Sequence, residues 1–337
     1  MLSNFNKSIL DRINKRARTD ENTGFGTNSN YYGGRYYNKS GIPNAYKTGL
    51  PFWERYSVFH TMLHMPLWKF LLVILITFII VNVLFAILYL TIGLENLAGV
   101  QVTKTIDKIG EAFFFSSQTF TTVGYGRLAP TGFWMSLVAS LESLLGLLAL
   151  ALATGLIYGR FSKPEAFIKF SKNAIIAPYK DGIAIMMRMA PYKNTNLTDA
   201  EAKLTLGMIV DENNVKTNKF YSLPLELSKV NALTLSWTLV HAIDENSPLY
   251  GLSMFDLKQA NAEVIVFLKA FDESYSNNVV TRTSYTYQEI KVGAKFIPMY
   301  HRTEDGSSTV LEMKLLDATT PVDLSKAKSM NLEELAA

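Results

Sequence analysis

The residues best suited to chemistry in this chain lie in a short segment, TTVGYG, at residues 121–126. Backbone carbonyl oxygens can replace the water around a cation if successive carbonyls point toward one axis. An ordinary strand alternates its carbonyls, but Gly124 and Gly126 can adopt positive φ at little steric cost and turn the intervening carbonyls the same way. The Thr122 hydroxyl can add a ligand. The segment therefore predicts a cation site built mainly from backbone oxygens, whose five residues are Thr122, Val123, Gly124, Tyr125 and Gly126.

The pentapeptide TVGYG at residues 122–126 is also the established sequence of potassium-channel selectivity filters. One chain cannot surround an ion, so the motif implies K⁺ ions held by a homotetramer, with three further copies of the chain as partners and no organic cofactor. The apolar segment before it predicts a pore helix over residues 110–121. A helix that enters the membrane from outside and stops midway points its negative dipole end at the pore centre, which favours a cation.

Two long stretches of low charge flank this loop. Residues 70–94 carry no charged side chain, and residues 128–159 carry one, that of Glu142. Each stretch exceeds the roughly 20 residues that cross the hydrocarbon core of a bilayer. We therefore expect transmembrane helices over residues 67–93 and 132–160.

The basic residues set the orientation of these spans. Residues 1–69 contain ten Lys or Arg and four Asp or Glu, whereas residues 95–127 contain three of each sign. Because cytoplasmic loops carry an excess of basic residues, both termini of this multi-pass membrane protein should be cytoplasmic. The pore domain as a whole is expected over residues 66–163.

The chain before the first span contains two segments that differ in composition and in residue pattern. Residues 1–50 are rich in Asn, Gly, Tyr and Lys without a sustained period, which predicts a disordered arm. Within residues 51–65, apolar or aromatic residues recur at helical spacing, at Trp53, Tyr56, Phe59 or His60, and Leu63. This pattern predicts an amphipathic slide helix that lies in the plane of the membrane.

The second span places several residues on one broad helical face, at spacings of four or eight residues. Glu142, the one charged side chain of the two low-charge stretches, is either a site for cations or blockers or a group buried against Thr or backbone groups. Gly146 allows either a bend or close packing. Leu150 and Tyr158 form either a hydrophobic constriction or a helix–helix contact. These four residues are the candidate pore and gate positions.

After the second span the residue pattern becomes typical of a β protein. Short alternating runs such as AIIAPY (174–179) and AEVIVFLKAF (262–271) are separated by turn signals such as Lys180-Asp181-Gly182. About eight such runs predict an immunoglobulin-like β-sandwich over residues 164–320, followed by a tail at 321–337. The whole chain should thus have a membrane α + β fold.

Several functions are disfavoured by what the sequence lacks. It has no cysteine, which excludes disulfides and thiolate chemistry. No GxGxxG follows a strand, so a Rossmann-type nucleotide sensor is not expected. The charges of the β-rich part are nearly balanced, which argues against nucleic-acid binding. We find no nucleophile–base pair and no metal-ligand set, so an enzyme is not expected.

The combination resembles the inward-rectifier K⁺ channels, and in particular their prokaryotic branch, the KirBac channels. The resemblance covers roughly residues 50–315. The segments that carry it are AFFFSSQTFTTVGYGRLAP (112–130), LESLLGLLALALATGLIYGRFSKP (141–164), LSWTLVHAIDENSPLYG (235–251) and SYTYQEIKVGAKF (284–296). The LSWTLVHAIDENSPLYG segment is far more specific to this family than the filter is.

The resemblance implies further roles. Leu150 and Tyr158 fall where the family places its bundle-crossing constriction. A second constriction, at the top of the cytoplasmic domain, falls on a loop that includes Tyr285, Thr286, Tyr287 and Gln288. Residues near the inner membrane surface, where relatives contact anionic phospholipid or phosphoinositide headgroups, are Lys69, Arg160 and Lys163. A prokaryotic channel of this type implies the bacterial inner or plasma membrane.

This chain also departs from the family. Many relatives have a pore-helix Glu at the position of Gln118, which in eukaryotic members pairs with an Arg just after the filter; here Arg127 is displaced by one position. Strong rectifiers carry an acid at the position of Leu150, so block by polyamines or Mg²⁺ is expected to be weak unless another acid substitutes.

Three hypotheses follow. The first is a homotetrameric K⁺-selective channel of inward-rectifier type, gated at the bundle crossing and the cytoplasmic domain and modulated by anionic lipid. The second is a two-span K⁺ channel gated by an unrelated ligand domain, which an α/β rather than a β-sandwich tail would favour. The third is a non-conducting, membrane-anchored β-sandwich adaptor, which monomeric behaviour in mild detergent would favour.

Overall fold

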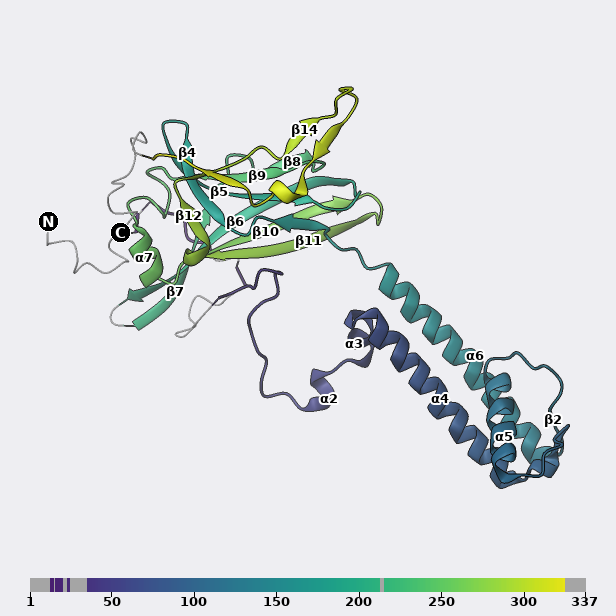
Figure 1. Cartoon of the computed structure of the whole chain (residues 1–337). Coiled ribbons are helices and arrows are strands. Elements are labelled where there is room, and N and C mark those ends of the chain that lie inside the picture. Colours follow the sequence, from purple (N-terminus) through teal and green to yellow (C-terminus); the bar gives the residue numbers. More distant parts are fainter. Residues whose placement is uncertain (1–12, 15, 21–22, 25–34, 213–214, 325–337) are drawn as a thin grey trace. The chain divides into compact units, whose positions relative to one another are not determined.

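The computed structural model describes residues 13–14, 16–20, 23–24, 35–212 and 215–324. The described chain divides into two compact units (Figure 1). Residues Lys47–Lys163 form a helical unit. The residues up to Tyr46 and those from Pro164 onward form a strand unit.

The helical unit contains two helices long and apolar enough to cross a membrane, α4 (Leu67–Ile92) and α6 (Phe133–Phe161). Between them lies the shorter α5 (Thr105–Phe120), which begins five residues earlier than expected because residues Thr105–Lys108, three of which are polar, are also helical. Two short strands join the segments before and after α5. They are β1 (Leu97–Ala98) and β2 (Ala129–Pro130), which pair antiparallel. The 3₁₀ turn η1 (Leu94–Asn96) precedes β1.

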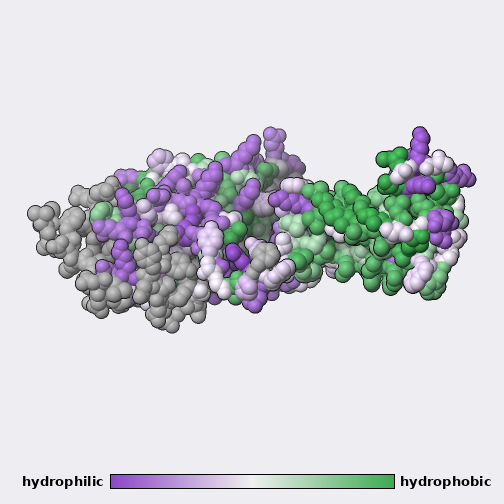
Figure 2. All heavy atoms as spheres, turned by 90° about the horizontal axis from the view of Figure 1, so that it is seen from below, coloured by the Kyte–Doolittle hydropathy of each residue, from purple (hydrophilic) through white to green (hydrophobic). Residues whose placement is uncertain are grey.

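The packing of this unit places large apolar side chains outward. Many leucines and isoleucines of α4 and α6 are exposed, and the surface of the helical unit is largely hydrophobic (Figure 2). The buried side chains are smaller or carry polar atoms, apart from a few large ones. They are Phe70, Asn82, Ala86 and Tyr89 on α4 and Met135, Ala139, Glu142 and Gly146 on α6. This arrangement suits a lipid solvent, in which apolar contact between helices gains nothing over contact with lipid.

The slide helix expected over residues 51–65 is divided into two, α2 (Phe52–Arg55) and α3 (Val58–His64). The division falls at Ser57, whose extended backbone and side-chain oxygen cap α3 by accepting from the His60 amide. Serine is among the strongest N-cap residues, so it starts a new helix here.

The strand unit is a sandwich of two five-stranded sheets. In the first sheet the order is β12-β4-β5-β3, with β9 also paired to β5; in the second it is β11-β10-β6-β7, with β8 also paired to β6. The strands of the first sheet are β3 (Ile168–Phe170), β4 (Ala174–Tyr179), β5 (Gly182–Pro191), β9 (Trp237–Ala242) and β12 (Ile290–Val292). Those of the second are β6 (Leu197–Glu212), β7 (Val215–Leu223), β8 (Lys229–Ala232), β10 (Glu263–Asp272) and β11 (Asn277–Thr286).

One hydrophobic core lies between the two sheets. It joins Ile183 and Ile185 of β5 to Leu206 of β6 and Val264 of β10, all almost fully buried. The runs AIIAPY (174–179) and AEVIVFLKAF (262–271), which the sequence predicts as strands, correspond to β4 and β10. With the two spans, the sandwich gives the predicted membrane α + β fold.

Smaller elements complete the strand unit. The six-residue α7 (Met254–Gln259) starts with a capping box between Ser253 and Asp256 and was not expected from the sequence. The strand unit also contains two short antiparallel strand pairs and two 3₁₀ turns. These are β13 (Ala294–Phe296) with β16 (Thr319–Pro321), β14 (Tyr300–Arg302) with β15 (Thr309–Leu311), η2 (Tyr287–Glu289) and η3 (Met313–Leu315).

Part of the arm expected to lack structure is packed onto the strand unit. The Tyr36 ring is buried against Phe220, with ring centroids 5.1 Å apart. The amides of Tyr36 and Tyr37 both donate to the buried carboxylate of Glu263, at 2.6 and 3.2 Å. The aromatic residues in this Asn- and Gly-rich segment supply apolar area that its composition alone did not suggest. The rest of the arm up to residue 34, except residues 13–14, 16–20 and 23–24, and the tail from residue 325 lie outside the described residues.

Candidate ion-conducting site

The backbone of the TVGYG segment alternates in handedness. Thr122, Gly124 and Gly126 have φ values of 59°, 54° and 80°. Positive φ at every second residue turns carbonyls that would otherwise alternate toward a common side. The positive φ expected for the two glycines is confirmed. The positive φ of Thr122 was not predicted, because threonine has no general preference for this conformation.

The filter segment is held to the end of α5 by backbone hydrogen bonds. The Val123 and Gly124 amides both donate to the Gln118 carbonyl, at 2.9 and 3.4 Å. The Thr122 amide donates to the Thr119 carbonyl at 3.1 Å. These bonds satisfy carbonyls that the helix end leaves free, and they fix where the filter segment starts relative to the helix.

Gly146 brings α6 against the end of α5. A Cβ atom built on Gly146 would lie 1.9 Å from the Phe120 carbonyl oxygen, a distance that no real contact allows. The close-packing alternative is therefore the one that the structure realises. The backbone that precedes the filter is pressed against α6 at this point.

Glu142 does not share the open face of α6 with the other candidate pore residues. Its side chain is fully buried within one chain, where one carboxyl oxygen contacts the Tyr89 hydroxyl of α4 and the other contacts the Ser116 hydroxyl of α5. The expectation that it lines the pore is corrected, because α5 covers the upper part of this helix face. Of the two alternatives, burial is the one observed, but the partners are the hydroxyls of a tyrosine and a serine and not Thr or backbone groups.

Leu150 and Tyr158 lie lower on α6, past the part that α5 covers. Their side chains are 61% and 73% exposed in the single chain. Neither side chain is covered by another part of the described helical unit.

The three residues expected near lipid headgroups differ in their surroundings. Arg160 donates to the carbonyls of Met62, at 2.9 Å, and of Met65, both at the end of α3. This cation sits at the negative end of the α3 dipole and ties α3 to α6. Lys69 and Lys163 are exposed, and the Lys69 ammonium lies 5.3 Å from the centre of the Trp68 ring.

The expected cytoplasmic constriction spans the end of β11 and η2. Tyr285 is fully buried, and its hydroxyl donates to the Ser171 carbonyl at 2.8 Å, so it cannot line an opening. Thr286 and Tyr287 are half-buried, and Gln288 is exposed. Tyr285 is corrected to a core residue because the inward alternation of β11 continues through it.

Two basic residues of the arm contact this loop, which sequence reasoning missed. Arg35 and Lys39 pair with Glu289 at 3.0 and 3.2 Å, and the Lys39 ammonium lies 3.9 Å from the centre of the Tyr285 ring. Although burial opposes it, the Thr286 amide and the two cations hold the pKa of Glu289 below its usual value. Burial lowers the pKa of Lys39. Arg35 and Lys39 lie far from Glu289 in sequence, so no local sequence pattern predicts these ion pairs.

Arg127 forms a forked ion pair with Glu111 near the start of α5, with one nitrogen–oxygen distance of 3.0 Å. The displaced arginine thus has a partner on the pore helix, but not at Gln118. The pair is partly exposed, so its contribution to stability is small.

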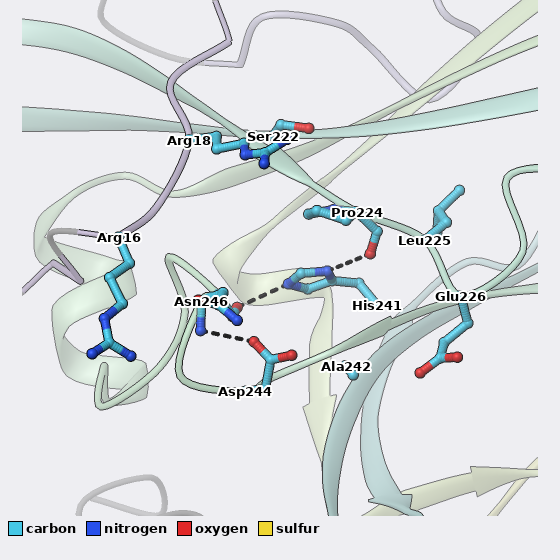
Figure 3. A pocket seen from close by; sticks show the side chains of 11 residues that line it. Arg16, Arg18, Ser222, Pro224, Leu225, Glu226, His241, Ala242, Asp244 and Asn246 are labelled. Carbon is cyan, nitrogen blue, oxygen red and sulfur yellow. Dashed lines mark hydrogen bonds between the residues drawn. The ribbon is translucent and has the colours of Figure 1, made fainter.

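An open pocket in the strand unit has His241 in its wall (Figure 3). The ring nitrogens contact the Pro224 carbonyl, at 2.7 Å, and the Ser247 hydroxyl, at 2.8 Å. Burial lowers the pKa of His241. Both ring nitrogens are engaged, which suits the structural role expected for this residue. Among the described residues, no three acidic or histidine side chains are grouped so that they could hold a metal ion.

Comparison with known proteins covers both units. A model of the inward rectifier potassium channel C-terminal domain matches residues 168–337, and an ion channel model matches residues 69–163. The inward rectifier potassium channel Kirbac3.1 of Paramagnetospirillum magnetotacticum is 33% identical over 251 residues, 74% of this chain and 83% of the relative. The inward rectifier potassium channel irk-1 of Caenorhabditis elegans is 25% identical over 311 residues, 86% of this chain and 57% of the relative. The G protein-activated inward rectifier potassium channel 4 of Homo sapiens is 25% identical over 294 residues, 79% of this chain and 68% of the relative. The chain belongs to the inward rectifier potassium channel family.

Proposed function

We propose that this chain forms a homotetrameric, K⁺-selective channel of inward-rectifier type. The observation that carries the proposal is the alternating backbone of Thr122, Gly124 and Gly126 at the end of α5, between two helices that can span a membrane. Four such segments around one axis would present successive rings of oxygens that replace the hydration shell of K⁺. Val123 and Tyr125, exposed in the single chain, would be covered in the tetramer.

The gate is proposed at the lower end of α6. Four copies of Leu150 or Tyr158 around the axis would form an apolar ring that closes the pore by excluding water. Their exposure in the single chain supports this role. Replacing either residue by alanine should raise the open probability, because apolar bulk is removed from a narrow point. Unchanged single-channel behaviour in both variants would place the gate elsewhere.

Modulation by anionic lipid is proposed through Lys69 and Lys163. Both are exposed near the ends of membrane-spanning helices, where a basic residue gains about 1 kcal/mol from an anionic surface. Arg160 already uses its donors on α3, so we assign it to positioning that helix. The orientation proposed from the basic residues puts both termini in the cytoplasm of a bacterial cell. Within the strand unit, Gln288 is the residue proposed to face the second constriction.

Uptake of Rb⁺ into liposomes that contain the purified protein tests the proposal. We expect uptake that Ba²⁺ blocks, little uptake of Na⁺, and a change in rate when phosphoinositide is added to the lipid. Equal Na⁺ and Rb⁺ uptake by folded tetramers would refute K⁺ selectivity. A monomer in mild detergent that gives no flux would instead favour the adaptor hypothesis.

A further inference from the structure

A chain of polar contacts runs behind the filter through the three helices of the pore unit. The Tyr89 hydroxyl contacts one oxygen of the Glu142 carboxyl, and the Ser116 hydroxyl contacts the other. The Ser116 oxygen also lies 2.9 Å from the Asn82 side-chain oxygen. The Asn82 amide nitrogen in turn donates to the Phe78 carbonyl at 2.7 Å. Asn82, Ser116 and Glu142 are all fully buried.

These four contacts require four protons. If Glu142 is ionised, only three are available, one each from Tyr89, Ser116 and the Asn82 amide, because a carboxylate donates none. Ser116 has one hydroxyl proton for two acceptors, so one contact would join two oxygens with no hydrogen between them. Reversing the Asn82 amide does not help, because its oxygen would then face the Phe78 carbonyl.

A proton on Glu142 completes the chain. The acid hydroxyl then donates to Ser116, Ser116 donates to Asn82, and Asn82 donates to the Phe78 carbonyl, while Tyr89 donates to the second oxygen of Glu142. Each contact now has one hydrogen, and all the hydrogen bonds between Glu142 and the Phe78 carbonyl run in one direction.

The surroundings offer no countercharge for an ionised Glu142. Tyr89 is the one titratable side chain that contacts it, and in the described part of the chain no basic side chain pairs with it. Two other charged groups of the helical unit, Arg127 and Glu111 of α5, pair with each other. Because Glu142 is fully buried within one chain, another subunit cannot supply a cation, and an uncompensated buried carboxylate is strongly disfavoured.

We infer that Glu142 is a positioning residue that acts as a neutral carboxylic acid, whose proton completes a directed hydrogen-bond chain that fixes α5 between α4 and α6 behind the filter. Ser116 lies two residues before Gln118, whose carbonyl receives the Val123 and Gly124 amides. A shift of α5 at Ser116 would therefore move the start of the filter. The inference rests on the proposed function, since it assigns a residue that supports K⁺ selectivity.

The substitution Glu142→Gln tests this role directly. A glutamine has one acceptor and one donor group, so it reproduces the protonated acid but not the carboxylate. We expect E142Q tetramers to conduct Rb⁺ within about twofold of wild type with the same exclusion of Na⁺. E142A leaves buried donors and acceptors unpaired, and we expect roughly a tenfold or greater loss of Rb⁺ over Na⁺ selectivity per tetramer. Ser140→Ala, which removes an exposed hydroxyl bonded within its own helix, is the matched control.

Infrared spectroscopy gives a second readout that does not depend on flux. The difference spectrum between wild type and E142Q should contain the carbonyl stretch of a protonated carboxylic acid at neutral pH. Absence of that band in folded tetramers, or E142Q as defective as E142A, would overturn the protonated acid. Selectivity of E142A equal to that of wild type would overturn the positioning role. A wild-type protein without K⁺ selectivity would refute the proposed function instead, and the infrared band would still decide the protonation state.

Discussion

The two units of the chain bury different kinds of side chain. In the helical unit, the buried positions of α4 and α6 include Asn82, Glu142 and Gly146, while large apolar side chains face outward. In the strand unit, residues such as Leu206 and Val264 fill one core between two sheets. The surface in Figure 2 shows the same contrast, hydrophobic over the helices and mostly hydrophilic over the visible strands.

The difference shows how each unit specifies its packing. Water drives apolar side chains into the strand core, and the energy is spread over many residues. In lipid that driving force between helices is absent, so close approach at small residues and a few hydrogen bonds must set the geometry. Single contacts should therefore determine function in the helical unit, whereas in the strand unit each large buried side chain should contribute its own share of the stability.

Gly146→Ala should produce the largest effect. The new methyl group would overlap the Phe120 carbonyl oxygen, so α5 or α6 must move just where the filter begins. We expect K⁺ flux in liposomes to be lost. The control is Gly155→Ala on the same helix, where an added Cβ meets no atom within 4 Å. If both variants conduct normally, close packing at Gly146 does not position the filter.

A matched pair of leucine substitutions compares the two units directly. Leu206→Ala opens a cavity in the strand core and should lower the free energy of unfolding by about 2–5 kcal/mol. Leu84→Ala removes the same atoms from an exposed position on α4 and should lower it by less than about 1 kcal/mol. Denaturant or thermal unfolding of the full-length protein measures both. Similar losses would contradict the contrast between the units.

The sequence predicts the fold better than it predicts the contacts that position the site. The two stretches of low charge locate α4 and α6, and alternation locates the main strands, because burial and lipid exposure each impose a regular pattern. The TVGYG motif locates the segment that is predicted to form the filter. In contrast, the Glu142 contacts depend on α5 folding back between two spans, and the pairing of Arg35 with Glu289 joins residues 254 positions apart. No local period encodes such contacts.

Arg160→Lys should loosen α3 from α6. A lysine cannot reproduce the fork that donates to the Met62 and Met65 carbonyls. We expect the spectrum of a spin label at Phe59→Cys, on this cysteine-free chain, to report greater mobility of α3. Lys163→Gln, at an exposed position, should leave the label unchanged. Equal mobility in wild type and Arg160→Lys would remove Arg160 from this role.

The smallest predicted effect is the pH dependence of the stability of the strand unit, which should depend on His241. Because burial lowers its pKa in the folded state, the neutral ring is favoured there. Its contribution to stability is present above the unfolded pKa of about 6.5 and is lost as the pH falls toward the folded pKa, by at most about 1.4 kcal/mol per pH unit. Melting temperatures across this range should fall less steeply in His241→Gln. The exposed His301→Gln should follow wild type, and identical curves for all three proteins would contradict this assignment.

The reversal potential of purified channels in a planar bilayer tests the central claim most directly. With K⁺ at tenfold different concentrations and Na⁺ balancing the ionic strength, filters formed by residues 122–126 of four chains should give a potential near the K⁺ equilibrium value, about 59 mV for a tenfold ratio. Addition of Ba²⁺ should abolish the current. A reversal potential near zero, from tetramers that conduct, would show that the alternating backbone of Thr122, Gly124 and Gly126 does not form a K⁺-selective filter.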